Sequence, residues 1–328
     1  MQHPKHFDTL LRDTVNLPQG RLNQLDERVE AIYRALRRDG VLGGLVTGKT
    51  KQGSWAHQMI IKPRPNKEYD ADVLIHMEEN PHWAGDPAKY IEELYWALGR
   101  ARYERSRKTR CVRVHYANDC HVDLVPYVET AFGQMIVNRT TGEWETSNPE
   151  GFTAWMRERD EITHGNFRRV VRLMKYLRDH KNSFTGTRSI ILTTLLGERA
   201  NAWAELADPS AYKNVPNTLV ALVGALDEWM QGRPTMPDVV DPSSPRTTFN
   251  HRWSQESYAY FRDRIHVHAA EMRAALLESD PENSEKMWRA LFGDGFRSTS
   301  AGAASTSPLS AAGAGGAVAS SGRSGRAG

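Results

Sequence analysis

The chain has 328 residues, of which 39% are hydrophobic, and this length allows one large or two ordinary domains with a buried core. The net charge is +3, and because segment 299–328 holds two arginines and no acid, the remainder carries only +1, which excludes the charge balance of a strong nucleic-acid binder. No run of about 18 uncharged apolar residues and no apolar signal segment occurs, so we expect a cytoplasmic protein without a membrane partner.

The first half of the chain predicts a mixed α/β region that ends near residue 150. Apolar residues recur at helical spacing over 22–36, and a second helix is expected near 86–104. Between them, the apolar residues 41–46 predict a strand that leads to a Gly-Ser turn. Strands and helices alternate here, as in an α/β domain.

Three aspartates lie on predicted strands. Asp70 and Asp72 precede an apolar run, and since residues i and i+2 of a strand point to the same face, both carboxylates project together. Asp123 lies within the predicted strand 120–125, and 111–116 is its expected hairpin partner. A neighbouring strand can therefore deliver a third carboxylate to the first two.

Both cysteines fall on this hairpin. A turn at Asn118-Asp119 would place Cys120 opposite Ala117 and leave Cys111 several pairs away. We therefore expect no disulfide, which suits a reducing cytosol, and the Cys and His spacing does not predict a zinc site.

One basic cluster follows the helix expected near 86–104. Cations in the last turn of a helix interact favourably with its dipole, so a solvated helix end would explain the cluster, and a phosphate-contacting patch is the alternative. Its members are Arg100, Arg102, Arg105, Arg107, Lys108 and Arg110.

The second half of the chain predicts helices, because apolar residues recur three and four apart. Prolines and serines between 234 and 245 indicate a surface connection within this half. Residues 298–328 are almost entirely Ser, Gly, Ala and Thr and predict a disordered tail. We expect two packed lobes with a cleft between them. The expected helices cover 149–160, 166–181, 187–206, 216–231 and 254–279.

The three aspartates together predict a shared divalent cation. A strand carboxylate between bulky apolar neighbours is costly unless it is paired, hydrogen-bonded or bound to a cation. Mg²⁺ needs few protein carboxylates, because substrate phosphates and water supply its other ligands. With Gly53 and Ser54 upstream, the order of motifs predicts a nucleotidyltransferase site, although each piece alone is typical of edge strands and loops. Gly53 would allow close approach of the backbone to phosphate, and Ser54 would donate to a triphosphate.

The stretch GSWAHQMIIKPRPNKEYDADVLIHM, followed by CHVDLVPYV, resembles the cGAS/DncV-like nucleotidyltransferases (CD-NTases) of bacterial CBASS anti-phage systems, in the polymerase-β-like superfamily. Many members carry Gly-Thr shortly after the Gly-Ser turn, where this chain has Gln58-Met59. The resemblance covers about residues 20 to 297. Its further segments are Leu173–Leu177, Ser189–Thr194, Val240–Pro242 and Trp288–Gly293.

This resemblance implies the fold class and its division. A polymerase-β-like nucleotidyltransferase core, a mixed α/β sheet with helices, is expected in residues 1–160. A helical C-terminal lobe that completes the nucleotide cleft is expected in 161–297, and the disordered Gly/Ala/Ser-rich tail in 298–328.

The resemblance also implies an activity. NTPs, ATP or GTP among them, would be joined into a cyclic di- or trinucleotide second messenger with release of pyrophosphate, for a downstream anti-phage effector. Asp70, Asp72 and Asp123 would be the catalytic residues and would hold two Mg²⁺ ions, for which Mn²⁺ can substitute. Two alternatives remain open, namely template-independent nucleotidyl transfer to RNA or a protein hydroxyl, and an inactive nucleotide-binding module.

Lys175 and Ser189 are further candidates, because the family places a triphosphate-binding lysine and serine on a pair of helices. A solvated cation and a helix N-cap are the ordinary explanations for these two residues. His57 and His121 flank the motifs, but metal-assisted attack needs no histidine base, so we expect them to be bystanders.

The tail suggests a conjugation site. It ends in small residues at Gly328, and many relatives are encoded beside ubiquitin-like conjugation partners. One hypothesis is that such an enzyme activates Gly328 and joins it to a target amine. A solubilising low-complexity extension is the alternative.

Overall fold

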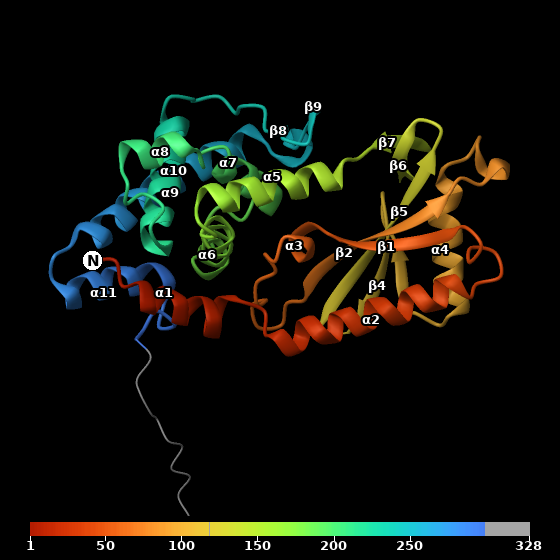
Figure 1. Cartoon of the computed structure of the whole chain (residues 1–328), viewed down its shortest axis with the longest axis horizontal. Coiled ribbons are helices and arrows are strands. Elements are labelled where there is room, and N and C mark those ends of the chain that lie inside the picture. Colours follow the sequence, from red (N-terminus) through yellow and green to blue (C-terminus); the bar gives the residue numbers. More distant parts are fainter. Residues whose placement is uncertain (118, 299–328) are drawn as a thin grey trace, which may run out of the picture. The chain divides into compact units, whose positions relative to one another are not determined.

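A mixed sheet flanked by helices occupies one side of the protein, and a group of helices occupies the other (Figure 1). The computed structural model describes residues 1–117 and 119–298. The expectations for a disordered tail and for conjugation at Gly328 fall outside the described residues, apart from Ser298. No helix among those described is both long and apolar enough to span a membrane.

The sheet is built around one parallel pair of strands. Among the described residues, seven strands belong to this sheet: β1 (Val46–Gln52), β2 (Tyr69–Glu78), β3 (Arg105–Arg107), β4 (Val112–Tyr116), β5 (Cys120–Thr130), β6 (Gly133–Asn138) and β7 (Glu143–Thr146). Their order is β1-β2-β5-β4-β3, with β6 paired to β5 and β7 paired to β6. β2 and β5 run parallel, and the other pairs in this sheet are antiparallel. The mixed sheet agrees with the expected fold class.

Two helices cover one face of the sheet, α2 (Gln19–Arg37) and α4 (Ala88–Arg100). Alternate residues of β2 and β5, such as Val73 and Val122, are buried against these helices. The residues between them, including Asp70, Asp72 and Asp123, point to the other face because side chains alternate along a strand. The acids are thus kept out of the core.

The predicted helices at 22–36 and 86–104 are confirmed by α2 and α4, but the strand expected at 41–46 is wrong. The segment forms a turn, in which the Asp39 side chain accepts hydrogen bonds from the backbone N–H groups of Val41 and Leu42. Leu42 is buried in the core between helices and sheet, so its apolar character reflects packing. The strand begins only at Val46.

The helical side has its own core, and the first residues of the chain contribute to it. The ring centroid of Phe7 lies 5.0 Å from that of Trp288 and 4.9 Å from that of Phe296. This joins α1 (Pro4–Leu10), which continues into the π-helical turn Leu11–Val15, to the last helix, α11 (Pro281–Phe292), and the segment after it. The remaining α-helices of this side are α5 (Pro149–Ile162), α6 (Phe167–His180), α7 (Ser189–Gly197), α8 (Ala202–Ala207), α9 (Val215–Gln231) and α10 (Gln255–Leu277).

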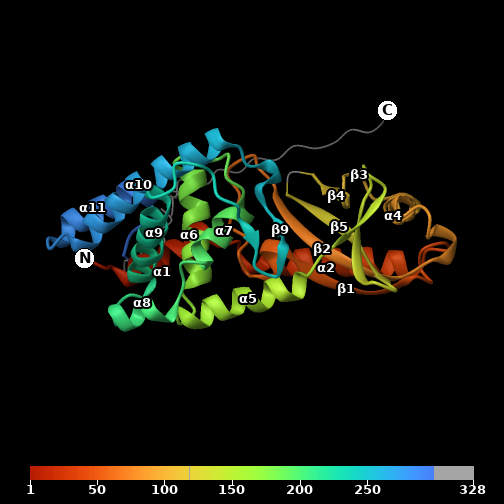
Figure 2. The same ribbon diagram turned by 90° about the horizontal axis from the view of Figure 1, so that it is seen from above.

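Four of the five expected helices of this half are confirmed by α5, α6, α9 and α10. The helix expected over 187–206 is two helices, α7 and α8, because the Asn201 side chain accepts a hydrogen bond from Ala204 N–H and starts a new helix. The surface connection contains the short pair β8 (Val240–Asp241) and β9 (Ser244–Thr248), which lies beside α5 in Figure 2. The division at residue 160 stays a prediction.

The β4–β5 hairpin is confirmed, but its register differs from the expected one. Cys120 pairs with Tyr116 and not with Ala117. Both cysteines are free, as expected, and both are buried. The one-residue difference brings Arg113 directly opposite Asp123.

Candidate functional site

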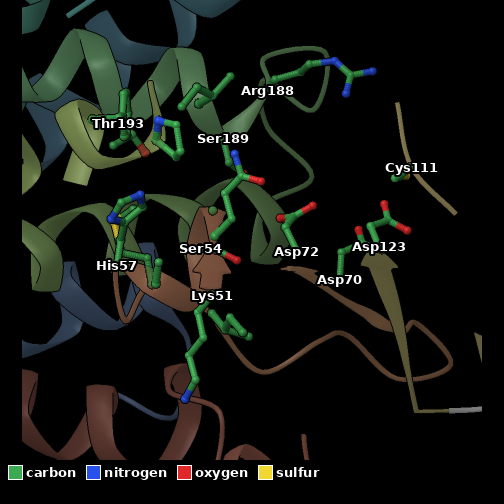
Figure 3. A pocket seen from close by; sticks show the side chains of 18 of the residues that line it. Lys51, Ser54, His57, Asp70, Asp72, Cys111, Asp123, Arg188, Ser189 and Thr193 are labelled. Carbon is green, nitrogen blue, oxygen red and sulfur yellow. The ribbon is translucent and has the colours of Figure 1, made fainter. Parts of the chain in front are cut away.

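A cleft of about 2120 Å³ is lined by both sides of the protein. The sheet side contributes residues of β1, β2 and β5, and the helical side contributes residues of α5, α6, α7 and the segment before α7. In Figure 3 the three aspartates lie together on one side of this pocket, with Ser54 and Ser189 beside them. The structure therefore gathers residues that the chain separates widely. All seven described candidate residues line the cleft, namely Gly53, Ser54, Asp70, Asp72, Asp123, Lys175 and Ser189.

The acids meet because β2 and β5 are neighbours in register. Asp72 is directly opposite Asp123, and Asp70 lies two residues away on the same face of β2. Burial, followed by the negative charges of Asp123 and Asp70, raises the pKa of Asp72 to about 7. This carboxylate is therefore in a setting that a bound cation would stabilise.

Arg113 of β4 is the main protein cation among these acids. Its Nε lies 2.7 Å from Asp123 Oδ1 and its Nη2 lies 2.8 Å from Asp123 Oδ2, which is a two-pronged ion pair. The same Nη2 lies 3.4 Å from Asp70 Oδ1. The hydrogen bond to Asp123 raises the pKa of Arg113 above its usual range. Arg113 was not predicted as a site residue, because the register expected from the sequence places Val114, and not Arg113, opposite Asp123.

Gly53 is needed for the position of an acid. It has a φ of +60°, and a Cβ atom there would lie 2.5 Å from Asp72 Oδ2. Any other side chain would have to displace the carboxylate. The sequence suggested that the absent side chain makes room for phosphate, but in this structure the space is filled by Asp72. Gly53 opens the single turn α3 (Gly53–Ala56), directly after β1.

The helical side of the cleft presents a buried lysine. Lys175 Nζ donates a hydrogen bond of 2.7 Å to the carbonyl oxygen of Met59, in the segment that follows α3. Burial, together with the charge of Arg178, lowers the pKa of Lys175 to about 8. The alternative of a solvated cation is wrong, because only 7% of this residue is exposed.

Ser189 is held by a second cation that the sequence analysis missed. Arg178 Nη1 lies 3.2 Å from Ser189 Oγ and 3.2 Å from the carbonyl oxygen of Thr187, and donates to both. Ser189 is the first residue of α7, not its N-cap, and no side chain caps this helix. The N-cap explanation is therefore wrong. Helical spacing carried the signal for Arg178, which lies three residues after Lys175.

The two histidines behave differently. His57 lines the cleft and is buried, its Nδ1 has no hydrogen-bond partner in the described structure, and burial lowers its pKa to about 4. His121 Nε2 lies 2.7 Å from Glu68 Oε2 and does not line the cleft. His57 is thus a neutral cleft residue, and no reactive role is needed for either histidine.

The basic cluster is not a solvated helix end, because α4 ends at Arg100 and the chain continues into β3. Arg107 Nε lies 2.6 Å from Glu92 Oε2, and Arg110 Nε lies 2.5 Å from Glu145 Oε2. Arg107, Lys108 and Arg110 line the cleft, but two of these three charges are already paired.

The carboxylate groups of the three acids are suitable ligands for a divalent cation, but their present arrangement does not form a complete site. Carboxylate oxygens are the ligands that Mg²⁺ and Mn²⁺ take, and burial followed by the charges of Asp123 and Asp70 disfavours the ionised form of Asp72, which a bound cation would favour. Within the described part of the chain, however, no three His, Cys, Asp or Glu side chains are gathered tightly enough to hold one ion. Both oxygens of Asp123 accept hydrogen bonds from Arg113.

Known proteins match this chain in sequence and in fold. Residues 1–160 match the family described as the Second Messenger Oligonucleotide or Dinucleotide Synthetase domain. The chain is 25% identical to a c-di-GMP synthase of Roseivirga ehrenbergii, over 72% of this chain and 70% of that protein. It is 24% identical to a cyclic AMP-AMP-AMP synthase of an Acinetobacter species, over 64% of this chain and 61% of that protein. The structure of CdnG of Bradyrhizobium diazoefficiens in complex with GTP has a TM-score of 0.69 at 21% identity, over 88% of this chain and 94% of CdnG.

Proposed function

Since the chain belongs to the cGAS/DncV-like nucleotidyltransferases, we propose that it joins nucleoside triphosphates into a cyclic di- or trinucleotide, a second messenger for anti-phage signalling. The observation that carries this proposal is the set of three carboxylates that two adjacent strands present to one cleft. Pyrophosphate leaves at each transfer. ATP and GTP are the expected substrates, because the relatives above are named for products that contain these bases.

The size of the cleft supports a reaction between nucleotides. Pockets for one drug-sized ligand measure about 300–1,000 Å³. A cleft of about 2120 Å³ has room for two nucleotides side by side, or for a linear intermediate. A large nucleic acid is a poorer fit, because Arg107 and Arg110 are already paired with acids and leave few free cations for a long phosphate backbone.

We propose that Asp70, Asp72 and Asp123 hold Mg²⁺, with Mn²⁺ as a substitute, and that the activity depends on it. When bound, such ions neutralise charge on the phosphates and activate the attacking hydroxyl. Gly53 supports this role, because its missing side chain leaves Asp72 in the cleft. The catalytic effect then comes from position and charge, without covalent chemistry by the protein.

The opposite wall supports binding of the donor triphosphate. Lys175 and Arg178 bring two cations to the cleft, and Ser189 and Ser54 add hydroxyl groups. Lys175 also holds the backbone of Met59, so phosphate binding is coupled to the segment that follows Gly53 and Ser54. We propose that these residues place the reacting phosphate over the acids.

The test is direct. The pure protein is incubated with all four NTPs and Mg²⁺, and phosphatase-resistant products are identified by mass spectrometry. A cyclic di- or trinucleotide supports the proposal. Labelled RNA, or a protein that gains the mass of a nucleotide while no cyclic product forms, would support the acceptor alternatives instead. The variant Asp70→Asn serves as the inactive control.

A further inference from the structure

Arg113 is the one arginine of the described residues that contacts two of the three cleft acids. Backbone pairing fixes it opposite Asp123, because β4 and β5 are antiparallel neighbours. Its guanidinium takes both oxygens of Asp123, at 2.7 and 2.8 Å, and approaches Asp70 Oδ1 at 3.4 Å. The pairing of β4 with β5 therefore fixes this contact, in contrast to an ion pair between flexible surface side chains.

This ion pair and a divalent cation need the same oxygens. A two-pronged arginine occupies one lone pair on each oxygen of the carboxylate and leaves only the second one for a metal ion. A cation bound between Asp72 and Asp123 would also place two positive charges within a few ångströms of each other, in a partly buried site where charges interact strongly. The arginine and the cation therefore compete for Asp123.

The side chain of Arg113 also has room to rotate away from Asp123. The side chain of Arg113 is 22% exposed, and that of Asp70, its second partner, is 60% exposed. A rotation about the side-chain bonds of Arg113 can release Asp123 into the cleft while the strands keep their register. The backbone does not have to move.

We propose that Arg113 is an internal counter-ion that a divalent cation displaces from Asp123. This inference rests on the proposed function for the identity of the cation. Arg113 neutralises part of the repulsion among the acids until the cation enters, and it thereby lowers the affinity of the free enzyme for the cation. Arg113 is a positioning residue, because it acts through Asp123.

The experiment measures Mn²⁺ binding by electron paramagnetic resonance, on the full chain without nucleotide. Arg113→Gln keeps much of the side-chain length but removes the charge. We expect it to bind Mn²⁺ about tenfold more tightly, because one charge-assisted pair, worth roughly 1.4 kcal/mol, no longer competes. Arg113→Lys keeps the charge without the two-pronged geometry and should lie between the wild type and Arg113→Gln.

Two controls make the result specific. Arg110→Gln removes a cleft arginine whose partner is Glu145, and it should leave Mn²⁺ affinity unchanged. In an Asp123→Asn background, Arg113→Gln should lose its effect, since the contested carboxylate is gone. If Arg113→Gln misfolds by circular dichroism, Arg113→Lys decides alone, with an expected gain of about threefold.

Unchanged or weaker Mn²⁺ binding in Arg113→Gln would overturn the inference, and weaker binding would indicate that Arg113 orients Asp123 for the cation. The outcome is separable from the proposed function. If the wild type forms a cyclic product but Arg113→Gln has unaltered Mn²⁺ affinity, the counter-ion inference is wrong and the proposed function stands. If Arg113→Gln binds Mn²⁺ more tightly but the wild type forms no cyclic product, the proposed function is wrong and the counter-ion inference stands.

Discussion

The candidate site residues on the two walls of the cleft have charges of opposite sign, acids on the sheet wall and cations on the helical wall, and the fold uses these charges differently. On the sheet wall, Asp70 and Asp72 project from a strand whose other face forms the core, and no backbone group of the described structure depends on them. On the helical wall, Lys175 and Arg178 donate to the backbone carbonyls of Met59 and Thr187. The two acids are thus available to a ligand, whereas the two cations also stabilise the backbone.

This difference predicts how each wall responds to substitution. Removing an acid should affect synthesis and spare the fold, because clustered like charges destabilise one another. Removing a cation of the helical wall should affect both.

Asp72→Asn should lower synthesis of the cyclic product by about 100-fold or more, because a charged ligand at the reacting centre is lost. The unfolding free energy should stay the same or rise, since the raised pKa of Asp72 marks a carboxylate that burial and its neighbours disfavour. Product is measured by chromatography and stability by urea unfolding.

Glu78→Gln is the matched control for that variant. It neutralises an exposed acid of the same strand, outside the cleft, and should change neither quantity. Ordinary synthesis by Asp72→Asn would contradict the catalytic assignment of the sheet wall.

Lys175→Met should reduce kcat/KM for NTP by about 10- to 100-fold, the loss expected for a charge-assisted phosphate contact of roughly 1.5–3 kcal/mol. It should also lower stability, since the carbonyl of Met59 loses its donor. Steady-state kinetics and thermal melting measure the two effects. A variant that melts earlier while its kcat/KM stays within about twofold would make Lys175 a structural residue only.

Gly53→Ala tests the link between the turn and the acids. The new Cβ would meet Asp72 Oδ2 at 2.5 Å, at a backbone φ of +60°, so we expect about tenfold slower synthesis and a stability loss of roughly 1–2 kcal/mol. Gly44→Ala is the control, because its Cβ would have nothing within 4 Å. Equal activity of the two variants would show that Asp72 does not depend on the space at Gly53.

The sequence predicted the sheet wall well because its signal is local. Alternation along one strand is enough to place Asp70 and Asp72 together, and no knowledge of distant contacts is needed.

Arg113 was missed for a physical reason. The expected turn placed Cys120 opposite Ala117, and that register would have put Val114, not Arg113, opposite Asp123. A slip of one residue exchanges the two faces of a strand.

The helical wall was less predictable because its contacts span long separations. The donation from Lys175 to Met59 joins residues 116 apart in the chain, and helical periodicity cannot reveal it. The packing of Phe7 on Trp288 is equally non-local. The mixed α/β character of the first half and the helix positions follow from local patterns, whereas the partners of buried charges depend on how the two sides meet.

A change of pH should affect stability alone, and this effect completes the contrast between the walls. The pKa of Asp72 is about 7 in the folded protein and has its ordinary value of 3.8 when unfolded, so between about pH 4 and pH 7 the folded state binds more protons. Without divalent cations, the unfolding free energy should therefore fall as the pH rises through this window, by roughly 1–3 kcal/mol relative to Asp72→Asn. Urea unfolding of both proteins at pH 5 and pH 8 measures the difference. Saturating Mg²⁺ should abolish it, because a bound cation favours the ionised carboxylate, and a pH dependence that persists unchanged in Asp72→Asn would assign it to other groups.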